Sequence, residues 1–520
     1  SAFAAQARSR DIRFVGPSPS VLELFGDKRR ALSLALEIGV PCLANSDALT
    51  NAAMAEEFFA SLPDDTAMLL KATAGGGGRG MRVVHSREEI DSAYQRCASE
   101  ASNAFGDGTL YAEEFLQNAR HIEVQVLGDG QRSAHLFERE CSLQRQRQKI
   151  VEIAPAPDIH PTLRKRLTDA AIELCRASAL DNVATVEFLV TGELTDADAR
   201  IAFIECNPRI QVEHTVTEEV TGLDLVALQL HLANGTTLDE LDLREPRAPQ
   251  GQAIQFRINM ESMQPDGMAY PASGTLTSYE PPGGHGVRVD GCGYTGYETN
   301  PAFDSLLAKL IVHAPNGDLA DALRKARGAL AEFSIVGVHH NIPFLRALAN
   351  DPDVMAGRFT TETVADKASR WLQDGPIGEP AEMSSQESNL AGARLESSDP
   401  LAVLDFGKQS AALASDSAPN AATPGTVVAP MPGTIVEHLV AIGSDVQAGT
   451  ELLVMEAMKM EHVIRAHASG QLTRYAAAPG DTVVANAPLA EIRMGDVAIN
   501  TGDTTTAIDL SVIRPDLAEV

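Results

Sequence analysis

The sequence has few basic residues for its length. It carries 42 Lys and Arg against 71 Asp and Glu, which gives a formal net charge of −29. So acidic a surface repels nucleic-acid phosphates and anionic lipid head groups, which argues against a nucleic-acid-binding or membrane-surface protein. Clusters of basic residues are informative in such a chain, because they can attract an anionic substrate.

Close cysteine pairs and long apolar runs are also missing. The six cysteines are scattered, which fits neither a disulfide framework nor a zinc site and indicates a reducing, cytoplasmic compartment. No apolar run approaches the roughly 18 residues of a membrane span, and no signal-peptide pattern opens the sequence. Because the chain starts at Ser1 inside an amphipathic segment rather than at Met, we expect it to begin inside a larger protein.

The remaining composition is that of a globular protein with several folding units. Apolar residues make up 44% of the 520 residues, enough for roughly three to four units with their own cores. The patterns predict a buried strand over 12–16, one helical stretch over 21–39 and strands over 67–73 and 81–84. Residues 116–375 mix strands with helices, which is typical of an α/β or α+β fold.

The C-terminal part contains a linker and an internal repeat. Residues 376–425 lose periodicity and fill with Pro, Ser, Ala and acidic residues, which predicts a flexible linker. Within 426–494, glycines and apolar residues recur at one constant offset: Gly433 with Gly470, Ile435 with Leu472, Gly443 with Gly480, Val446 with Val483, and Leu452 with Leu489. Duplicated β-type runs punctuated by glycine predict a small sandwich of two halves.

A lone lysine, Lys459, lies between the two repeats and is flanked by Met458 and Met460. Exposed methionines are unfavourable, but they are understandable if an enzyme recognises this turn and modifies the lysine. The alternative is an ordinary solvated lysine in a β-turn. The residues VMEAMKMEH resemble the biotinyl-domain family, whereas the related lipoyl domains usually carry Asp or Glu before the lysine.

Two further patterns suggest a phosphate and metal site. Lys71 ends a predicted strand before a loop of glycines, 75–80, that could cradle phosphate, although a structural turn is at least as plausible. In IECNPRIQVEH the polar residues fall on every second position, so an extended chain places them on one face. Glu187 lies on the preceding strand and can face Glu205 across a hairpin, and two carboxylates with the Asn207 oxygen suit Mg²⁺. The alternative is a solvated polar strand face.

A basic cluster, ERECSLQRQRQK, contains Arg139, Arg145, Arg147 and Lys149. Such a run is usually a solvated hairpin face. In a chain of this acidity, beside a predicted phosphate site, anion binding is a competitive interpretation.

Residues 1–375 resemble the biotin carboxylase domain, a member of the ATP-grasp fold. The matching segments are FGDK, KATAGGGGRGMR, EEFLQNARHIEVQV, ERECSLQRQRQK, VEFL, FIECNPRIQVEHTVTE, FRIN and FDSLLAKL. The fold expected is an α/β and α+β ATP-grasp domain lacking most of its N-terminal doubly wound subdomain, then a linker and an all-β flattened barrel of biotinyl type. The expected parts are a subdomain remnant (1–27), a lid region (28–115), a large lobe (116–375), a linker (376–425), a carrier (426–494) and an extension (495–520).

The resemblance implies roles at matching positions. Phosphates of ATP would be bound by Lys28, Lys71 and the lid glycines Gly76, Gly77 and Gly78. The adenosine pocket would be lined by Glu113, Leu116, His121 and Gln144. Mg²⁺, or Mn²⁺, would be held by Glu187, Glu205 and Asn207. Bicarbonate would be framed by Lys149, Arg209, Gln211 and Val212. Glu213 would be the general base, Arg257 would stabilise the biotin enolate, and Lys459 would carry biotin.

The expected function is ATP- and bicarbonate-dependent carboxylation of biotin on Lys459, the first half-reaction of an acetyl- or propionyl-CoA-type carboxylase. Expected partners are a carboxyltransferase, a biotin protein ligase and a second copy of the chain. Gln146 and Arg147 depart from the family, which usually has Arg and then His or Tyr there. The alternatives are a biotinylated carrier with an inactive, truncated carboxylase domain, and an unrelated ATP-grasp ligase with a lipoylated carrier.

Overall fold

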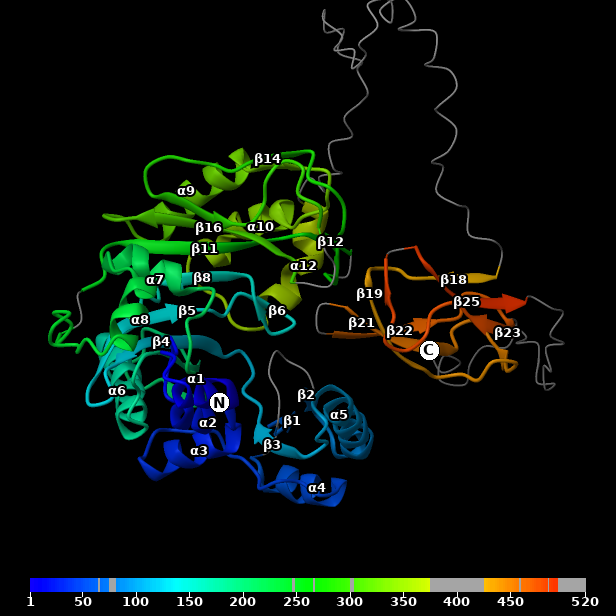
Figure 1. Cartoon of the computed structure of the whole chain (residues 1–520), viewed down its shortest axis with the longest axis horizontal. Helices are drawn as coiled ribbons and strands as arrows, with labels where there is room; N and C mark the ends of the chain where they lie inside the picture. The colour runs from blue at the N-terminus through cyan, green and yellow to red at the C-terminus, as the bar shows by residue number, and fades with distance from the viewer. Residues whose placement is uncertain are drawn as a thin grey trace, which may run out of the picture. The chain divides into compact units, whose positions relative to one another are not determined.

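The computed structural model describes residues 1–63, 66–73, 81–245, 248–264, 267–299, 304–374, 425–457, 460–484 and 486–493. The chain divides into two compact units, the first containing the described residues up to 374 and the second built by the strands after 425 (Figure 1). The predicted extension 495–520 and the predicted linker, apart from Gly425, lie outside the described residues. No helix in the described part of the chain is long and apolar enough to cross a membrane.

An eight-stranded sheet organises the first unit, with the strand order β10-β9-β4-β5-β8-β11-β16-β15. Its neighbouring strands pair antiparallel. The strands are β4 (Arg120–Gly128), β5 (Ser133–Glu140), β8 (Val151–Ala154), β9 (Val183–Thr191), β10 (Arg200–Asn207), β11 (Gln252–Asn259), β15 (Val287–Gly291) and β16 (Leu306–Ala314). A short hairpin lies between β5 and β8 in sequence, and each of its strands, β6 (Gln144–Arg145) and β7 (Gln148–Lys149), has two residues.

The two faces of this sheet carry opposite kinds of side chain. On β4, Ile122, Val124 and Val126 join an apolar core with α6 (Pro161–Ala177). The alternate residues His121, Glu123 and Gln125 of the same strand are polar and buried, whereas Leu127 joins a second apolar cluster with α8. Since successive side chains of a strand point to opposite faces, one face is a hydrophobic core and the other carries a buried polar region beside that second cluster. Helix α7 (His214–Thr221) contacts β5, β8, β11 and β16.

The other elements of the first unit complete separate apolar cores. Helices α9 (Leu319–Glu332), α10 (Ile342–Ala349), α11 (Pro352–Met355) and α12 (Thr363–Asp374) pack with β11 and β16. A three-stranded sheet of β1 (Met68–Ala72), β2 (Met81–Val84) and β3 (Leu110–Glu114) packs with α4 (Ala52–Ser61) and α5 (Ile90–Phe105), which follows the short 3-10 helix η1 (Arg87–Glu89). The smaller elements are α8 (Leu225–Ala233), β12 (Glu261–Met263), β13 (Ala269–Pro271), β14 (Ser278–Glu280) and β17 (Ser334–Val336).

The N-terminal segment corrects two predictions. The predicted strand at 12–16 is wrong: these residues form no strand, and Ile12 is 58% exposed. The apolar letters mark a surface segment between α1 (Ala2–Ser9) and α2 (Pro19–Gly26). The single helix predicted over 21–39 is two helices, because Asp27 caps α3 (Lys28–Glu37) by accepting from the backbone N–H groups of its first turn.

The second unit is a sandwich of two four-stranded sheets. Their orders are β18-β25-β23-β20 and β22-β21-β19-β24. The strands are β18 (Thr426–Val428), β19 (Gly433–His438), β20 (Asp445–Val446), β21 (Glu451–Ala457), β22 (Met460–Arg465), β23 (Gly470–Tyr475), β24 (Thr482–Val483) and β25 (Pro488–Arg493). The predicted all-β carrier fold is confirmed, and each sheet takes two strands from each repeat.

The repeat is visible in equivalent backbone positions. Gly443 and Gly480 both adopt left-handed conformations, with φ of 94° and 93°. A Cβ at Gly433 would lie 2.5 Å from a backbone oxygen of the neighbouring strand, and one at Gly470 would lie 2.4 Å from the equivalent oxygen. The predicted matches therefore have a physical cause, because glycine is required where the chain turns with positive φ or approaches another backbone closely.

Candidate active site

Three glutamates lie in register on neighbouring strands of the polar face. Glu205 on β10 pairs with Glu187 on β9, and Glu187 pairs with Glu123 on β4. The next residue in this row is Arg139 on β5. Like charges directly opposite one another destabilise a sheet, so this row requires cations to neutralise it. The predicted opposition of Glu187 and Glu205 is confirmed.

Lys149, at the end of β7, supplies one of these cations. Its Nζ lies 2.7 Å from Glu213 and 3.2 Å from Glu187, and it also donates to Glu123. Burial lowers the pKa of Lys149, but these three carboxylates outweigh burial and raise it well above its usual value. The predicted bicarbonate lysine is therefore firmly protonated.

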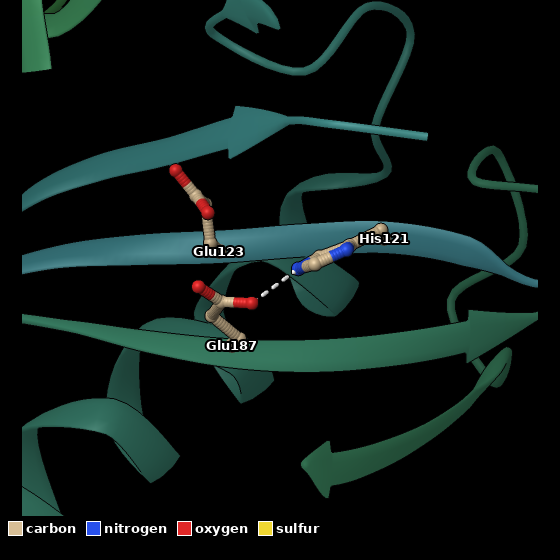
Figure 2. Close-up of side chains that lie close together, drawn as sticks. All are labelled: His121, Glu123 and Glu187. Carbon is tan, nitrogen blue, oxygen red and sulfur yellow. Dashed lines mark ion pairs between the residues drawn. The ribbon is translucent and has the colours of Figure 1, made fainter. Parts of the chain in front are cut away.

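His121 and Glu123 project from β4 beside Glu187 of β9 (Figure 2). The His121 ring Nε2 is 2.8 Å from a Glu187 oxygen, and its Nδ1 is 2.6 Å from the Gln144 amide nitrogen. Burial alone would raise the pKa of Glu187, but Lys149 and His121 hold it well below its usual value. Glu187 is therefore ionised and can bind a cation.

Arg139 continues the row on β5 with its side chain fully buried. It donates to Glu123, to Gln125 at 2.9 Å, to Thr185 at 3.1 Å and, from the sheet to α7, to Thr217 at 2.9 Å. A guanidinium that uses its donors internally cannot bind a substrate anion. This member of the basic cluster is structural, and so is Arg145, which binds both oxygens of Glu261 at 2.7 Å.

Glu213 immediately precedes α7 and sits between two cations. Lys149 binds one of its oxygens, and the guanidinium of Arg257 on β11 lies 3.2 Å from the other. Burial would raise the pKa of Glu213, but Lys149, Arg257 and Arg139 together lower it to about 2. The structure thus brings the predicted base, the bicarbonate lysine and the biotin-side arginine together.

The predicted metal ligands are assembled, with one amide turned the opposite way. Asn207 Nδ2 donates to Glu187 at 2.9 Å and to Glu205 at 3.0 Å, while its oxygen accepts from Arg209 at 3.1 Å. The amide thus holds the two carboxylates together through its N–H groups. Glu205 remains 36% exposed, and two adjacent carboxylates form the hard oxygen donor set that Mg²⁺ or Mn²⁺ prefers. The residues fit a divalent cation, and Asn207 would join its ligands only after its amide rotates.

The chain beyond β10 corrects the prediction of one extended segment from Glu205 to Glu213. The strand ends at Asn207, and the following residues turn into α7. Gln211 still reaches Glu187, at 2.9 Å, whereas Arg209 is exposed and reaches Asn207. Val212 offers its backbone oxygen to Lys309 at 3.2 Å. Pro208 cannot donate to a strand ladder, which gives a physical reason for the early strand end.

The predicted nucleotide residues come from several elements of the first unit. Lys28 at the start of α3 is 3.7 Å from Glu205. Lys71 on β1 forms an ion pair with Glu113 on β3, so the predicted phosphate and adenosine residues meet directly. Leu116 is buried in a small apolar cluster. The predicted lid glycines Gly76, Gly77 and Gly78, and also Lys459, lie outside the described residues.

Three buried residues of the site were not predicted: Glu123, Glu152 and Gln255. Glu152 on β8 accepts from the Arg257 Nε at 2.6 Å and from Gln255 at 2.9 Å. Burial raises the pKa of Glu152 against the attraction of Arg257. The signal for Glu123 was present in the sequence, since it alternates with apolar residues in HIEVQV as the predicted site residues do elsewhere.

Three protein families match this chain in sequence. Residues 27–241 match the carbamoyl-phosphate synthase L chain ATP-binding domain, residues 255–366 the biotin carboxylase C-terminal domain, and residues 425–492 the biotin-requiring enzyme family. The chain is 43% identical over 370 residues to human mitochondrial pyruvate carboxylase, which covers 70% of this chain and 30% of that protein. The chain thus spans about a third of the length of such relatives.

Solved structures show the same architecture. The biotin carboxylase domain of Hydrogenobacter thermophilus 2-oxoglutarate carboxylase, in complex with MgADP and bicarbonate, superposes with a TM-score of 0.65 at 38% identity, covering 71% of this chain and 79% of that one. A single-chain, multi-domain long-chain acyl-CoA carboxylase gives a TM-score of 0.61 at 35% identity and covers 95% of this chain and 43% of that one. The fold and site define an ATP-grasp protein joined to a biotinyl domain. The chain belongs to the biotin-dependent carboxylases, and it contains their ATP-binding, biotin carboxylase C-terminal and biotin domains.

Proposed function

We propose that this chain carboxylates biotin carried on Lys459, using ATP and bicarbonate. The observation that carries the proposal is the charged row Glu205–Glu187–Glu123 with Lys149 and Glu213 at its edge. A sheet that places three glutamates side by side and buries two of them gives up stability, which is expected where a cation and a phosphate substrate bind. The biotin domain supplies the group that such a site would serve.

Each residue has a chemical task in this proposal. Glu187 and Glu205 would hold the divalent cation, which supplies charge stabilisation to the ATP phosphates. Lys28 and Lys71 would neutralise further phosphate charge. Biotin, when bound, supplies the ureido nitrogen that accepts the carboxyl group, and Arg257 would stabilise negative charge on the ureido oxygen.

Bicarbonate would bind between Lys149 and Gln211. Lys149 is protonated and can donate to a bicarbonate oxygen, and the side chain of Gln211 would border the anion. The bicarbonate hydroxyl would donate to Glu213, which would remove that proton. A carboxylate with a pKa near 2 is a weak base. An anion that shares Lys149 and Arg257 weakens their hold on Glu213 and so strengthens it as a base.

The test is ATP hydrolysis by the full biotinylated chain with and without bicarbonate. We expect hydrolysis that depends on bicarbonate and is stimulated by free biotin. Glu213→Gln should lower the bicarbonate-dependent rate by about 100-fold or more, because the base is lost. The control is Glu138→Gln, a buried carboxylate that pairs with Arg164 instead. Hydrolysis that is equal without bicarbonate, or equal in both variants, would contradict the proposal.

For the acceptor, we propose an acyl-CoA of the acetyl- or propionyl-CoA type, which a carboxyltransferase subunit or domain would carboxylate. The support is the coverage of 95% of this chain by the long-chain acyl-CoA carboxylase, in which carboxylase and carrier are both matched. The pyruvate carboxylase relatives match over 70% of this chain and favour a keto acid instead. Transfer of labelled carboxyl from the charged carrier to acetyl-CoA, propionyl-CoA or pyruvate, with a transferase supplied, separates the two.

A second candidate is a biotinylated carrier module whose carboxylase unit does not turn over. The supporting observation is that the chain covers 79% of the Hydrogenobacter biotin carboxylase domain, so the match leaves part of that domain uncovered. Binding of MgADP with no bicarbonate-dependent hydrolysis would favour this candidate.

A further inference from the structure

We propose that Glu152 is a positioning residue that holds the guanidinium of Arg257 in place beside Glu213. The inference rests on the proposed function, because it concerns how the arginine expected to face biotin is aimed. Glu152 is fully buried on β8 and lies opposite Gln255 of β11, two residues before Arg257 on the same strand face. A carboxylate without access to water must keep its cationic and hydrogen-bonding partners.

Arg257 is shared unequally between two carboxylates. Its Nε and one terminal nitrogen lie 2.6 Å from Glu152 Oε1, whereas the contact to Glu213 is 3.2 Å. The tighter anchor is therefore Glu152, and the looser contact is to the proposed base, Glu213. Without the charge of Glu152, Glu213 is the remaining carboxylate that contacts Arg257 among the residues that the structure describes. The guanidinium would then be drawn onto Glu213 and away from the substrate.

A buried hydrogen-bond chain requires Glu152 to be an acceptor on both oxygens. Gln255 donates from Nε2 to Glu152 Oε2 at 2.9 Å, while Gln255 Oε1 accepts from the hydroxyl of Thr215 on α7. Gln255 and Thr215 are both fully buried. A glutamine at position 152 would direct its own NH₂ at either Arg257 or Gln255, both of which are donors there. Glu152→Gln therefore breaks one contact, whereas Glu152→Asp keeps two acceptors on a shorter side chain.

The experiment uses the full biotinylated chain as Glu152→Gln, Glu152→Asp and the control Glu138→Gln. Glu138 is also buried, but it accepts from Arg164 and from the Ala156 N–H. We measure kcat and KM for free biotin in bicarbonate-dependent ATP hydrolysis, and MgADP affinity by calorimetry. Glu152→Gln should lower kcat/KM for biotin by about 10- to 100-fold, as expected for a misplaced catalytic group. MgADP affinity should stay within about twofold, Glu152→Asp should recover part of the loss, and the control should match the parent chain.

Equal kcat/KM for biotin in Glu152→Gln and Glu138→Gln would overturn the inference while leaving the proposed function intact. If the parent chain binds MgADP but shows no bicarbonate-dependent hydrolysis, the proposed function fails instead. Crystal structures of the parent chain and Glu152→Gln then decide the inference independently of turnover. Movement of the Arg257 guanidinium onto Glu213 supports it, and an unmoved guanidinium overturns it.

Discussion

The two units bury opposite kinds of side chain. In the described part of the second unit every buried residue is apolar, whereas the first unit buries Glu123, Arg139, Glu152 and Glu187 inside its main sheet. Both units are built on antiparallel strands, so the difference lies in what the sheet faces carry. The first unit gathers charged side chains on one sheet face, where we propose that the reaction takes place, whereas the described strands of the second unit bury apolar side chains. The stability of the first unit should therefore be sensitive to the loss of a single buried charge. The stability of the second should be sensitive to a single cavity in its core.

The largest expected effect is on the attachment of biotin at Lys459. Lys459→Arg should abolish biotin incorporation completely, because arginine cannot form the amide, while the sandwich core is untouched. Intact-mass analysis after expression with a biotin protein ligase measures it and also distinguishes biotin from lipoate. The control is Lys165→Arg, whose side chain is 74% exposed on α6. Biotin found on the Lys459→Arg protein would show that another lysine is the carrier.

The next effect concerns the buried charge of the first unit. Arg139→Met should lower the free energy of unfolding by about 3–5 kcal/mol, because it removes a partner of a buried carboxylate. Urea unfolding followed by Trp371 fluorescence reports on this unit, since Trp371 is the single tryptophan and is buried there. The control Arg132→Met, at a side chain 63% exposed, should cost less than about 1 kcal/mol. Equal losses of unfolding free energy in the two variants would mean that the buried ion pairs contribute no more to stability than an exposed one.

The corresponding change in the second unit is a cavity. Leu472→Ala removes a fully buried side chain from the sandwich and should cost about 2–5 kcal/mol of carrier stability. Hydrogen exchange of β23 and β25 measures it, and the Trp371 signal should not change. Val463→Ala, at a residue 43% exposed, should cost less than about 1 kcal/mol. Loss of stability in the first unit as well would contradict independent units.

Lowering the pH should destabilise the first unit more than the second, with a smaller effect than the substitutions above. The pKa of Glu213 is depressed from 4.5 to about 2, so its contribution to stability is complete above pH 4.5 and is lost as the pH falls toward 2. The first unit should therefore weaken faster than the carrier across this range, and Glu213→Gln should flatten that dependence. Thermal melts between pH 5 and about 2.5, read by Trp371 and by β23 exchange, compare them. Parallel curves for both units would contradict the expectation.

Local signals in the sequence predicted a large part of the site. Period-two spacing and a short hairpin were enough to place Glu187 opposite Glu205, and the repeat gave the sandwich. Local signals failed where neighbours decide the outcome. The letters at 12–16 are apolar enough for a strand but form none, and Asp27 divides the predicted helix because its side chain caps the next one.

The contribution of distant strands could not be predicted. Glu152 and Arg257 are far apart in the sequence and meet only because β8 pairs with β11 in one particular register. No local pattern determines that register, since it depends on which faces the helices cover. The inference about Glu152 therefore required the structure, whereas the role expected for Arg257 came from resemblance.

The interleaving of the carrier halves has a consequence for synthesis. Each sheet of the sandwich needs strands from both repeats, and Lys459 falls between the repeats in sequence. A nascent chain that has just exposed Lys459 has not yet exposed β23 or β25, so no finished sandwich can present the lysine at that point. The modifying ligase would then meet a folded acceptor only after translation has passed the last strand. Chains whose translation stops before the last strand would then not be biotinylated and would consume no biotin.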